Sequence, residues 1–163
     1  MDWLYRRSIF DFGSMTDLNK DLRLYLQQNY CLHIPMSTKK ELSSDGTIKW
    51  MINQGASQAI ETVYIPEKKR GTLCISSQIG CLIDCPFCAT GHQGFNRNLS
   101  SAEIIGQVLL AKQDLQNEFK RDDLITNVVF MGMGEPLAKF SETVRATKIL
   151  TDPNGFNLSL IHI

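Results

Sequence analysis

The stretch GTLCISSQIGCLIDCPFC, residues 71–88, decides how this sequence is interpreted. Its first six residues, 71–76, are a short strand candidate, and a long irregular loop follows them through Leu99. Three of the five cysteines lie in this loop with the spacing Cys81-x-x-x-Cys85-x-x-Cys88. Ligands bind at the loop end of the strands in α/β folds. The loop is therefore a candidate ligand site.

The cysteine spacing favours an iron–sulfur cluster. Thiolates bind such clusters well, and three ligands from one loop leave one iron of a 4Fe-4S cluster open. An open iron can chelate the amino and carboxylate groups of S-adenosylmethionine (SAM), an arrangement for which this motif is known. A zinc site remains an alternative, with Cys74 or His92 as fourth ligand, although paired C-x-x-C units are absent. A disulfide does not suit a cytoplasmic chain, where thiols stay reduced.

A β/α order continues beyond the loop. Ser100 begins a predicted helix, and Glu103, three positions on, completes a capping box. Residues 125–131 form a buried-strand candidate, and a second helix is predicted from about 141 to 150. The order strand, loop, helix, strand, loop, helix predicts parallel strands joined by right-handed crossovers.

A glycine-containing loop, Gly132-Met133-Gly134-Glu135-Pro136, ends the second of these strands. Glycine lets a backbone approach a ligand closely, and the Glu135 carboxylate could accept hydrogen bonds from an ammonium group. The motif alone is a weak signal, but its place at a strand end after the cysteine triad makes it a ligand-loop candidate. Phe87, just before the last cysteine, fits an aromatic side chain packed near the adenine of SAM, or a plain loop anchor.

The N-terminal part has a different pattern. Residues 14–30 look like an amphipathic helix with Thr16 as a possible N-cap. A Ser/Lys-rich connection follows, which contains Pro35 and the turn pair Asp45-Gly46.

Two strands then alternate in polarity, over residues 47–53 and 59–66, with Gly55-Ala56-Ser57 as the turn between them. We therefore expect an accessory region of one helix and a β-hairpin over residues 1–66, followed by the core over residues 67–163.

Charge and hydropathy restrict the classes of partner. Lys+Arg and Asp+Glu are both 17, so the chain has no overall attraction for RNA or anionic membranes. RNA binding would have to use local basic groups such as Lys68-Lys69-Arg70 or Arg97, and such a run is usually a solvated face. No apolar run approaches the roughly 20 residues that span a bilayer, and the N-terminus lacks a signal-peptide core. A cytoplasmic protein without membrane contact is expected.

Taken together, the motifs resemble the RlmN-type radical SAM RNA (adenine-C2) methyltransferases of the RlmN/Cfr family. The resemblance runs to about Ser159 and rests on these segments: 43–47, 61–66, 72–81, the cysteine triad, 93–99, 103–107 and 131–136. It implies an α/β fold: a partial (β/α) TIM-like barrel of the radical SAM type, truncated here, behind an N-terminal helix-plus-β-hairpin accessory region.

The resemblance also implies cofactors and their ligands. Cys81, Cys85 and Cys88 would hold the 4Fe-4S cluster, and Gly134 and Glu135 would contact SAM. The implied substrates are an adenosine in 23S ribosomal RNA and one beside the tRNA anticodon, and an electron donor such as flavodoxin would reduce the cluster.

Two further residues gain catalytic roles only from the resemblance. In this family a radical made from SAM activates a methyl group carried on a protein cysteine, and the resulting carbon radical adds to adenine C2. Glu61 falls where the family has the base that removes the C2 proton. Cys74 falls where a thiolate releases the product by forming a disulfide with the carrier cysteine. Without the resemblance they would read as an exposed strand acid and a small buried residue.

The chain ends at Ile163, whereas the family carries its methyl-bearing cysteine near the C-terminus, and Cys31 lies in the wrong region to replace it. Residues 160–163 also depart from the family pattern, so we expect a fragment whose own activity is doubtful. Two rival functions remain. One is adenine-C8 methylation within the same family, of which residues 148–154 have some character, although residues 93–99 favour the C2 enzyme. The other is a non-catalytic cluster- or zinc-binding RNA-interaction module.

Overall fold

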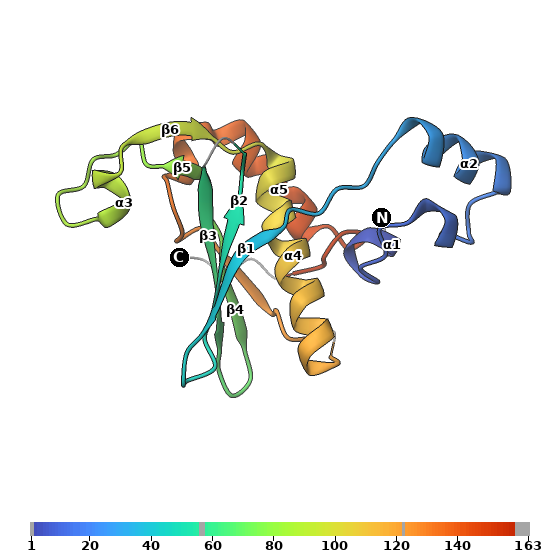
Figure 1. Ribbon diagram of the computed structural model, residues 1–163, viewed down its shortest axis with the longest axis horizontal. Helices are drawn as coiled ribbons and strands as arrows, with labels where there is room; N and C mark the ends of the chain where they lie inside the picture. The colour runs from blue at the N-terminus through green and yellow to red at the C-terminus, as the bar shows by residue number, and fades with distance from the viewer. Residues whose placement is uncertain (1, 56–57, 122, 159–163) are drawn as a thin grey trace.

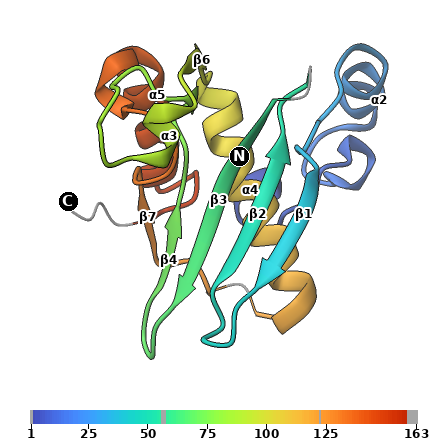
Figure 2. The ribbon, with the colours of Figure 1, turned by 60° about the vertical axis from the view of Figure 1, so that its left-hand side comes forward.

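An open β-sheet with helices on one face forms the centre of the protein. The computed structural model describes residues 2–55, 58–121 and 123–158. Helices α4 (Ser101–Phe119) and α5 (Phe140–Thr151) pack against one another and cover one face of the sheet (Figures 1 and 2). The opposite face is left uncovered by the described residues.

The sheet has five strands in the order β1-β2-β3-β4-β7. Their bounds are β1 Ser37–Leu42, β2 Ile48–Asn53, β3 Ala59–Pro66, β4 Gly71–Cys74 and β7 Asn127–Val129. The first four strands pair antiparallel, and β4 pairs parallel with β7. The predicted strands β2, β3 and β4 and the parallel pair are confirmed. Within the described residues the sheet stays open, and no closed barrel is present.

The alternation of buried and partly exposed side chains along the central strands creates the core. Successive strand side chains point to opposite faces, and three alternate side chains of β2 and three of β3 are buried in the core. The buried set on these strands is Ile48, Trp50, Ile52, Ile60, Thr62 and Tyr64. Their intervening neighbours are partly exposed on the uncovered face.

A buried glutamine fixes α4 to the sheet. The Gln107 side-chain oxygen accepts hydrogen bonds from the Thr62 hydroxyl and the Ser76 N–H, both at 2.8 Å. Its amide nitrogen donates to the Ser76 carbonyl at 2.9 Å. The helix starts as predicted, because Ser100 and Glu103 form a complete capping box.

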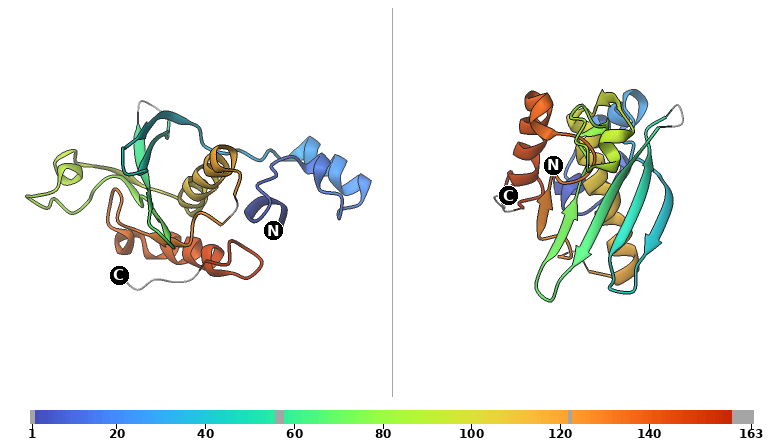
Figure 3. Two further views of the ribbon diagram at one scale, coloured as in Figure 1. Left: turned by 90° about the horizontal axis from the view of Figure 1, so that it is seen from below. Right: turned by 90° about the vertical axis from the view of Figure 1, so that its left-hand side faces the viewer.

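The N-terminal elements differ from the expectation. They are α1 (Asp2–Tyr5), the 3₁₀ turn η1 (Phe12–Ser14) and α2 (Lys20–Asn29). The prediction of Thr16 as N-cap is wrong: α2 begins later and is capped by Asn19, whose side chain accepts from the Leu22 N–H at 2.7 Å. Helix α2 stands away from the sheet (Figures 1 and 3) and has no buried residue.

The first strand was not expected. The sequence predicts a Ser/Lys-rich connection where β1 lies, because Lys39, Lys40 and Glu41 leave the segment without the apolar alternation typical of a strand. A charged edge strand is nevertheless favourable, since charge discourages pairing with another chain. The predicted turn at Asp45-Gly46 is confirmed: Gly46 has φ +86°. Residues 56 and 57 of the second predicted turn lie outside the described residues, as do residues 160–163.

The predicted irregular loop contains regular structure. Strands β5 (Gln78–Gly80) and β6 (Phe95–Asn98) pair antiparallel, and the short helix α3 (Ala89–His92) lies between them. This hairpin projects from the end of the main sheet, on the side away from α2 (Figure 1). Among the described residues, no helix has the length and apolar character to cross a membrane.

Candidate functional site

The β5–β6 hairpin closes the neck of the loop that carries the cysteine triad, residues 81–94, which we call the cysteine loop. The Cys81 N–H donates to the Gly94 carbonyl at 3.2 Å. Gly80 has φ +72°, and a Cβ atom there would lie 1.8 Å from the same carbonyl oxygen. Only glycine allows this close approach. The residue before the first cysteine thus fixes where the loop begins.

All three cysteines of the triad are free and partly exposed. Backbone bonds wind the loop tightly: the Cys85 N–H donates to the Ile83 carbonyl at 2.9 Å, and the Cys88 N–H donates to the Cys85 carbonyl at 3.0 Å. The Ile83 N–H also points at the Cys81 sulfur, 3.4 Å away.

Cys88 lies directly before α3, and this position favours its ionised form. The Gly91 and Thr90 N–H groups at the start of the helix lower the pKa of the Cys88 thiol, although neither makes a full capping hydrogen bond to it. A thiolate is the form that binds metal. The start of α3 therefore favours the thiolate form of Cys88.

The donor set of the cysteine loop fits an iron–sulfur cluster. In a 4Fe-4S cluster each thiolate binds its own iron, so the sulfurs need to surround a cluster and not a single ion. Within the described ranges, no three Cys, His, Asp or Glu side chains converge as ligands of one metal ion. Of the two fourth ligands considered for zinc, His92 lies within the cysteine loop, where its ring is hydrogen-bonded to the Pro86 carbonyl at 3.1 Å. Cys74 belongs to β4, outside the loop.

The glycine-containing loop, residues 132–136, runs beside residues 76–78, which lead into the cysteine loop. The Met133 carbonyl accepts from the Ser77 and Gln78 N–H groups at 2.8 and 3.1 Å, and the Met133 N–H donates to the Ser76 hydroxyl at 2.9 Å. Gly134 has φ +91°, and a Cβ there would lie 2.4 Å from the Gln78 Cβ. Gly134 therefore permits the close contact between the glycine-containing loop and Gln78 of β5.

Gln78 is the residue that sequence reasoning missed. It is fully buried, and its side-chain oxygen accepts from the Leu82 N–H and the Glu135 N–H, both at 3.1 Å. Its amide nitrogen donates to the Asn98 side chain at 2.8 Å. One side chain thus joins the cysteine loop, the glycine-containing loop and β6. The available signal was a glutamine next to Ile79 in a buried strand, where polar residues need partners.

Glu61 and Cys74 lie on the same face of adjacent strands. Cys74 pairs with Val63, and Glu61 is two residues before Val63, so the three share the uncovered face of the sheet. Burial raises the pKa of the Cys74 thiol. The Glu61 carboxylate forms an ion pair with Lys49 at 3.2 Å.

Side chains near the two loops are exposed. Phe87 is 88% exposed, so it does not anchor the cysteine loop by packing within it. Met131 and Leu137, on either side of the glycine-containing loop, are 67% and 68% exposed. The Glu135 side chain accepts from the Leu137 N–H at 3.2 Å and so caps the short turn η2 (Pro136–Lys139). Apolar surface is thus available around the place where a ligand would sit.

The basic groups considered for RNA are either distant from this surface or already paired. Lys68-Lys69-Arg70 forms the β3–β4 turn, at the opposite end of the sheet from the cysteine loop (Figure 1), and Arg70 pairs with Glu67. Arg97 is committed to Glu103, with two hydrogen bonds of 3.0 and 2.7 Å.

An open sheet backed by helices, with a cysteine loop and a glycine-containing loop at one end, resembles a solved radical SAM methyltransferase. The crystal structure of a radical SAM methyltransferase from Sphaerobacter thermophilus matches with a TM-score of 0.83 and 38% identity, over 97% of this chain and 46% of that one. More particularly, the chain is 50% identical over 159 residues to the dual-specificity RNA methyltransferase RlmN of Halorhodospira halophila. The resemblance to RlmN-type enzymes is confirmed.

The match with that RlmN covers 98% of this chain and 43% of the relative, so the chain spans less than half of the relative's length. The family model for the ribosomal RNA large subunit methyltransferase N-terminal domain matches residues 1–32. This segment includes α1, η1 and α2, which lie within the region expected to be accessory.

Proposed function

We propose that this chain forms the front part of a radical SAM enzyme that methylates C2 of adenosine in 23S rRNA and tRNA. One observation carries the proposal: three free thiols lie on a single loop, and the Gln78 side chain accepts hydrogen bonds from both this loop and the glycine-containing loop. Such a pair of loops can hold a cluster and a SAM molecule side by side. Within this proposal the fold is the first part of a (β/α) barrel, with residues 1–66 as the accessory region and residues 67–163 as the start of the core.

The residues fit the implied cofactors. Cys81, Cys85 and Cys88 would hold a 4Fe-4S cluster, which when bound supplies the electron that cleaves SAM. The loop around Gly134 and Glu135 would bind the amino end of SAM, since the Glu135 carboxylate attracts an ammonium group. Phe87 is free to pack on the adenine, because the loop does not use it internally.

Glu61 and Cys74 would serve the later proton and thiol steps. The Glu61 carboxylate would accept the proton from adenine C2, and its position on the uncovered face leaves it open to a substrate. Cys74 would attack the methyl-carrying cysteine to release the product. Burial favours its neutral thiol form, so this attack requires a base that takes the thiol proton.

The whole activity is proposed for the full-length protein, with rRNA and tRNA as substrates, a flavodoxin-like electron donor and a cytoplasmic location. The test is to incubate that protein with reductant, SAM and an RNA containing the target adenosine, and to identify the modified nucleoside by mass spectrometry against standards. We expect 2-methyladenosine. Formation of 8-methyladenosine would contradict the proposal and favour the C8 enzyme.

A further inference from the structure

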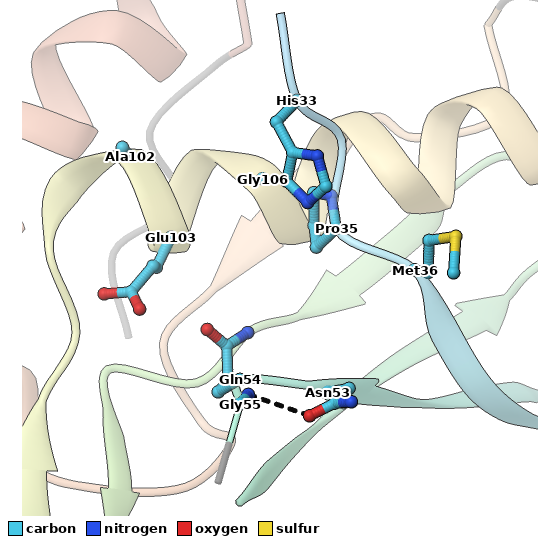
Figure 4. A pocket seen from close by; sticks show the side chains of 9 residues that line it. All are labelled: His33, Pro35, Met36, Asn53, Gln54, Gly55, Ala102, Glu103 and Gly106. Atoms are coloured by element: carbon cyan, nitrogen blue, oxygen red, sulfur yellow. Dashed lines mark hydrogen bonds between the residues drawn. The ribbon is translucent and has the colours of Figure 1, made fainter.

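A pocket of about 550 Å³ lies outside the loops described above. Residues 33–36 of the linker to β1, the end of β2 and the first turns of α4 enclose it (Figure 4). Its lining residues are His33, Pro35, Met36, Asn53, Gln54, Gly55, Ala102, Glu103 and Gly106. This volume is within the range of about 300–1,000 Å³ typical of small-ligand sites.

Two polar side chains of the pocket have no partner among the described residues. Neither the exposed His33 ring nor the half-buried Gln54 side-chain amide makes a hydrogen bond or ion pair with another described residue. Figure 4 shows the His33 ring and Pro35 on one side of the pocket and the Gln54 amide on the other. An amide presents a donor and an acceptor in one plane, which matches the edge of a nucleobase.

The charges of the pocket exclude a strong phosphate site. No lysine or arginine lines it. The Glu103 carboxylate is already engaged by Arg97 and by the N–H and hydroxyl of Ser100. Arg97 is used in neutralising this carboxylate, so no lining cation remains to hold an anionic group. A neutral, planar ligand suits the pocket better.

Apolar surface for stacking is also present. Met36 is 75% exposed, and its flexible thioether packs well on aromatic rings. Pro35 packs against α4, where a Cβ at Gly106 would approach it to 3.1 Å. A rigid apolar wall with an adaptable methionine beside it is suited to the face of a base.

The position of the pocket connects it with the proposed reaction. β2 ends at Asn53 at the same end of the sheet as the cysteine loop, because β2 and β4 both run antiparallel to β3 between them. Glu103 in the pocket is bonded to Arg97 of β6, the strand that leaves the cysteine loop. The pocket is therefore at the end of the molecule that an RNA substrate must approach.

We propose that this pocket binds an unstacked nucleobase of single-stranded RNA, read by the Gln54 amide and stacked against His33, Pro35 and Met36. The inference deepens the proposed function and rests on RNA being the substrate. Sequence-specific RNA binding commonly uses such splayed-out bases. The pocket would position a base next to the one that reacts.

Two probes test the proposal in the purified protein, without cluster or SAM. Adenosine is titrated while the nuclear magnetic resonance signals of the Gln54 side-chain amide and the His33 ring are followed, and ribose 5-phosphate serves as the probe that lacks a base. We expect adenosine to shift both signals and ribose 5-phosphate to leave them unchanged. Equal shifts with both probes, or none with adenosine, would overturn the proposal.

Variants make the test specific. Ala102 is exposed on α4, so Ala102→Phe should fill the pocket without disturbing the core and weaken single-stranded RNA binding about tenfold, as expected for one lost stacked base. Gln54→Ala should weaken it as well. Lys69→Ala, at the far end of the sheet, is the control and should bind as the unchanged protein does. Unchanged RNA affinity in both pocket variants would contradict the inference.

The outcome is distinguishable from failure of the proposed function. Base binding is measured without the cofactors, so a protein that binds adenosine here but does not methylate RNA refutes only the methyltransferase proposal. If the Ala102→Phe variant methylates RNA with full efficiency, only the proposed role of the pocket is refuted.

Discussion

The Gln78 side chain accepts a hydrogen bond from the Glu135 N–H at 3.1 Å, and the same oxygen accepts one from Leu82 at the same distance. A fully buried amide thus links the glycine-containing loop to the cysteine loop. Because these loops carry the proposed SAM and cluster ligands, Gln78 is placed to set their separation. It would act as a positioning residue, without touching the reacting atoms.

Replacing Gln78 by leucine should weaken both the fold and SAM binding. The Leu82 and Glu135 N–H groups would lose their buried acceptor, and each unsatisfied group costs about 1–3 kcal/mol. Gln78→Glu keeps an acceptor for both, and Asn98→Ala removes only the third contact. We expect Gln78→Leu to lower SAM affinity in cluster-loaded protein more than either comparison variant. Equal SAM affinity in all three, measured by equilibrium dialysis, would refute the positioning role.

Gly134→Ala should destabilise the protein more than Gly94→Ala. Both glycines have positive φ, +91° and +76°, so both variants carry a backbone cost of about 1–2 kcal/mol. Only at Gly134 would the new Cβ also collide with Gln78, whereas nothing lies within 4 Å at Gly94. Chemical denaturation measures the difference in free energy of unfolding. A larger loss for Gly94→Ala would contradict the described loop contact.

Cys85→Ala should abolish cluster retention, and Cys74→Ala should leave it intact. Two remaining thiolates hold a cubane cluster poorly, whereas Cys74 lies in β4, outside the cysteine loop. Iron content after anaerobic reconstitution and desalting reports the result. Equal iron loss in both variants would contradict the division of roles between the triad and Cys74.

The stabilising effect of Glu103 should disappear in acid. Burial opposes its ionisation, but the Arg97 ion pair and the Ser100 hydrogen bonds outweigh burial and lower the pKa below the ordinary 4.5. A carboxyl with a lowered folded-state pKa stabilises the fold above its unfolded pKa, and this contribution is lost as pH falls through the folded value. Glu103→Gln should therefore cost about 1 kcal/mol near neutrality. In urea titrations, the difference in unfolding free energy between the unchanged protein and Glu103→Gln should disappear below pH 4.5. A difference that is independent of pH would contradict this role of the Glu103 carboxylate.

Local signals in the sequence predicted the parts of the fold that local chemistry determines. Ser100 and Glu103 predict the start of α4 correctly, because a capping box involves only four consecutive residues. The alternation of β2 and β3 was visible because one face is buried completely. The charged strand β1 was missed, since an edge strand has no strong apolar pattern.

Long-range contacts explain what the sequence could not reveal. The partners of Gln78 lie up to 57 positions away, so its role depends on how β7 returns beside β4. The cysteine triad was evident from spacing alone, but the strands β5 and β6 that frame it form a pair across the whole loop. Glu61 and Cys74 share a face only through the register of β3 with β4.

The most direct test of the account is the iron and sulfide content of the anaerobically reconstituted protein, combined with electron paramagnetic resonance before and after SAM is added. We expect about four irons per chain and a reduced-cluster signal that changes when SAM binds the open iron. Protein that stays colourless and iron-free, with Cys81, Cys85 and Cys88 all open to alkylation, would contradict it.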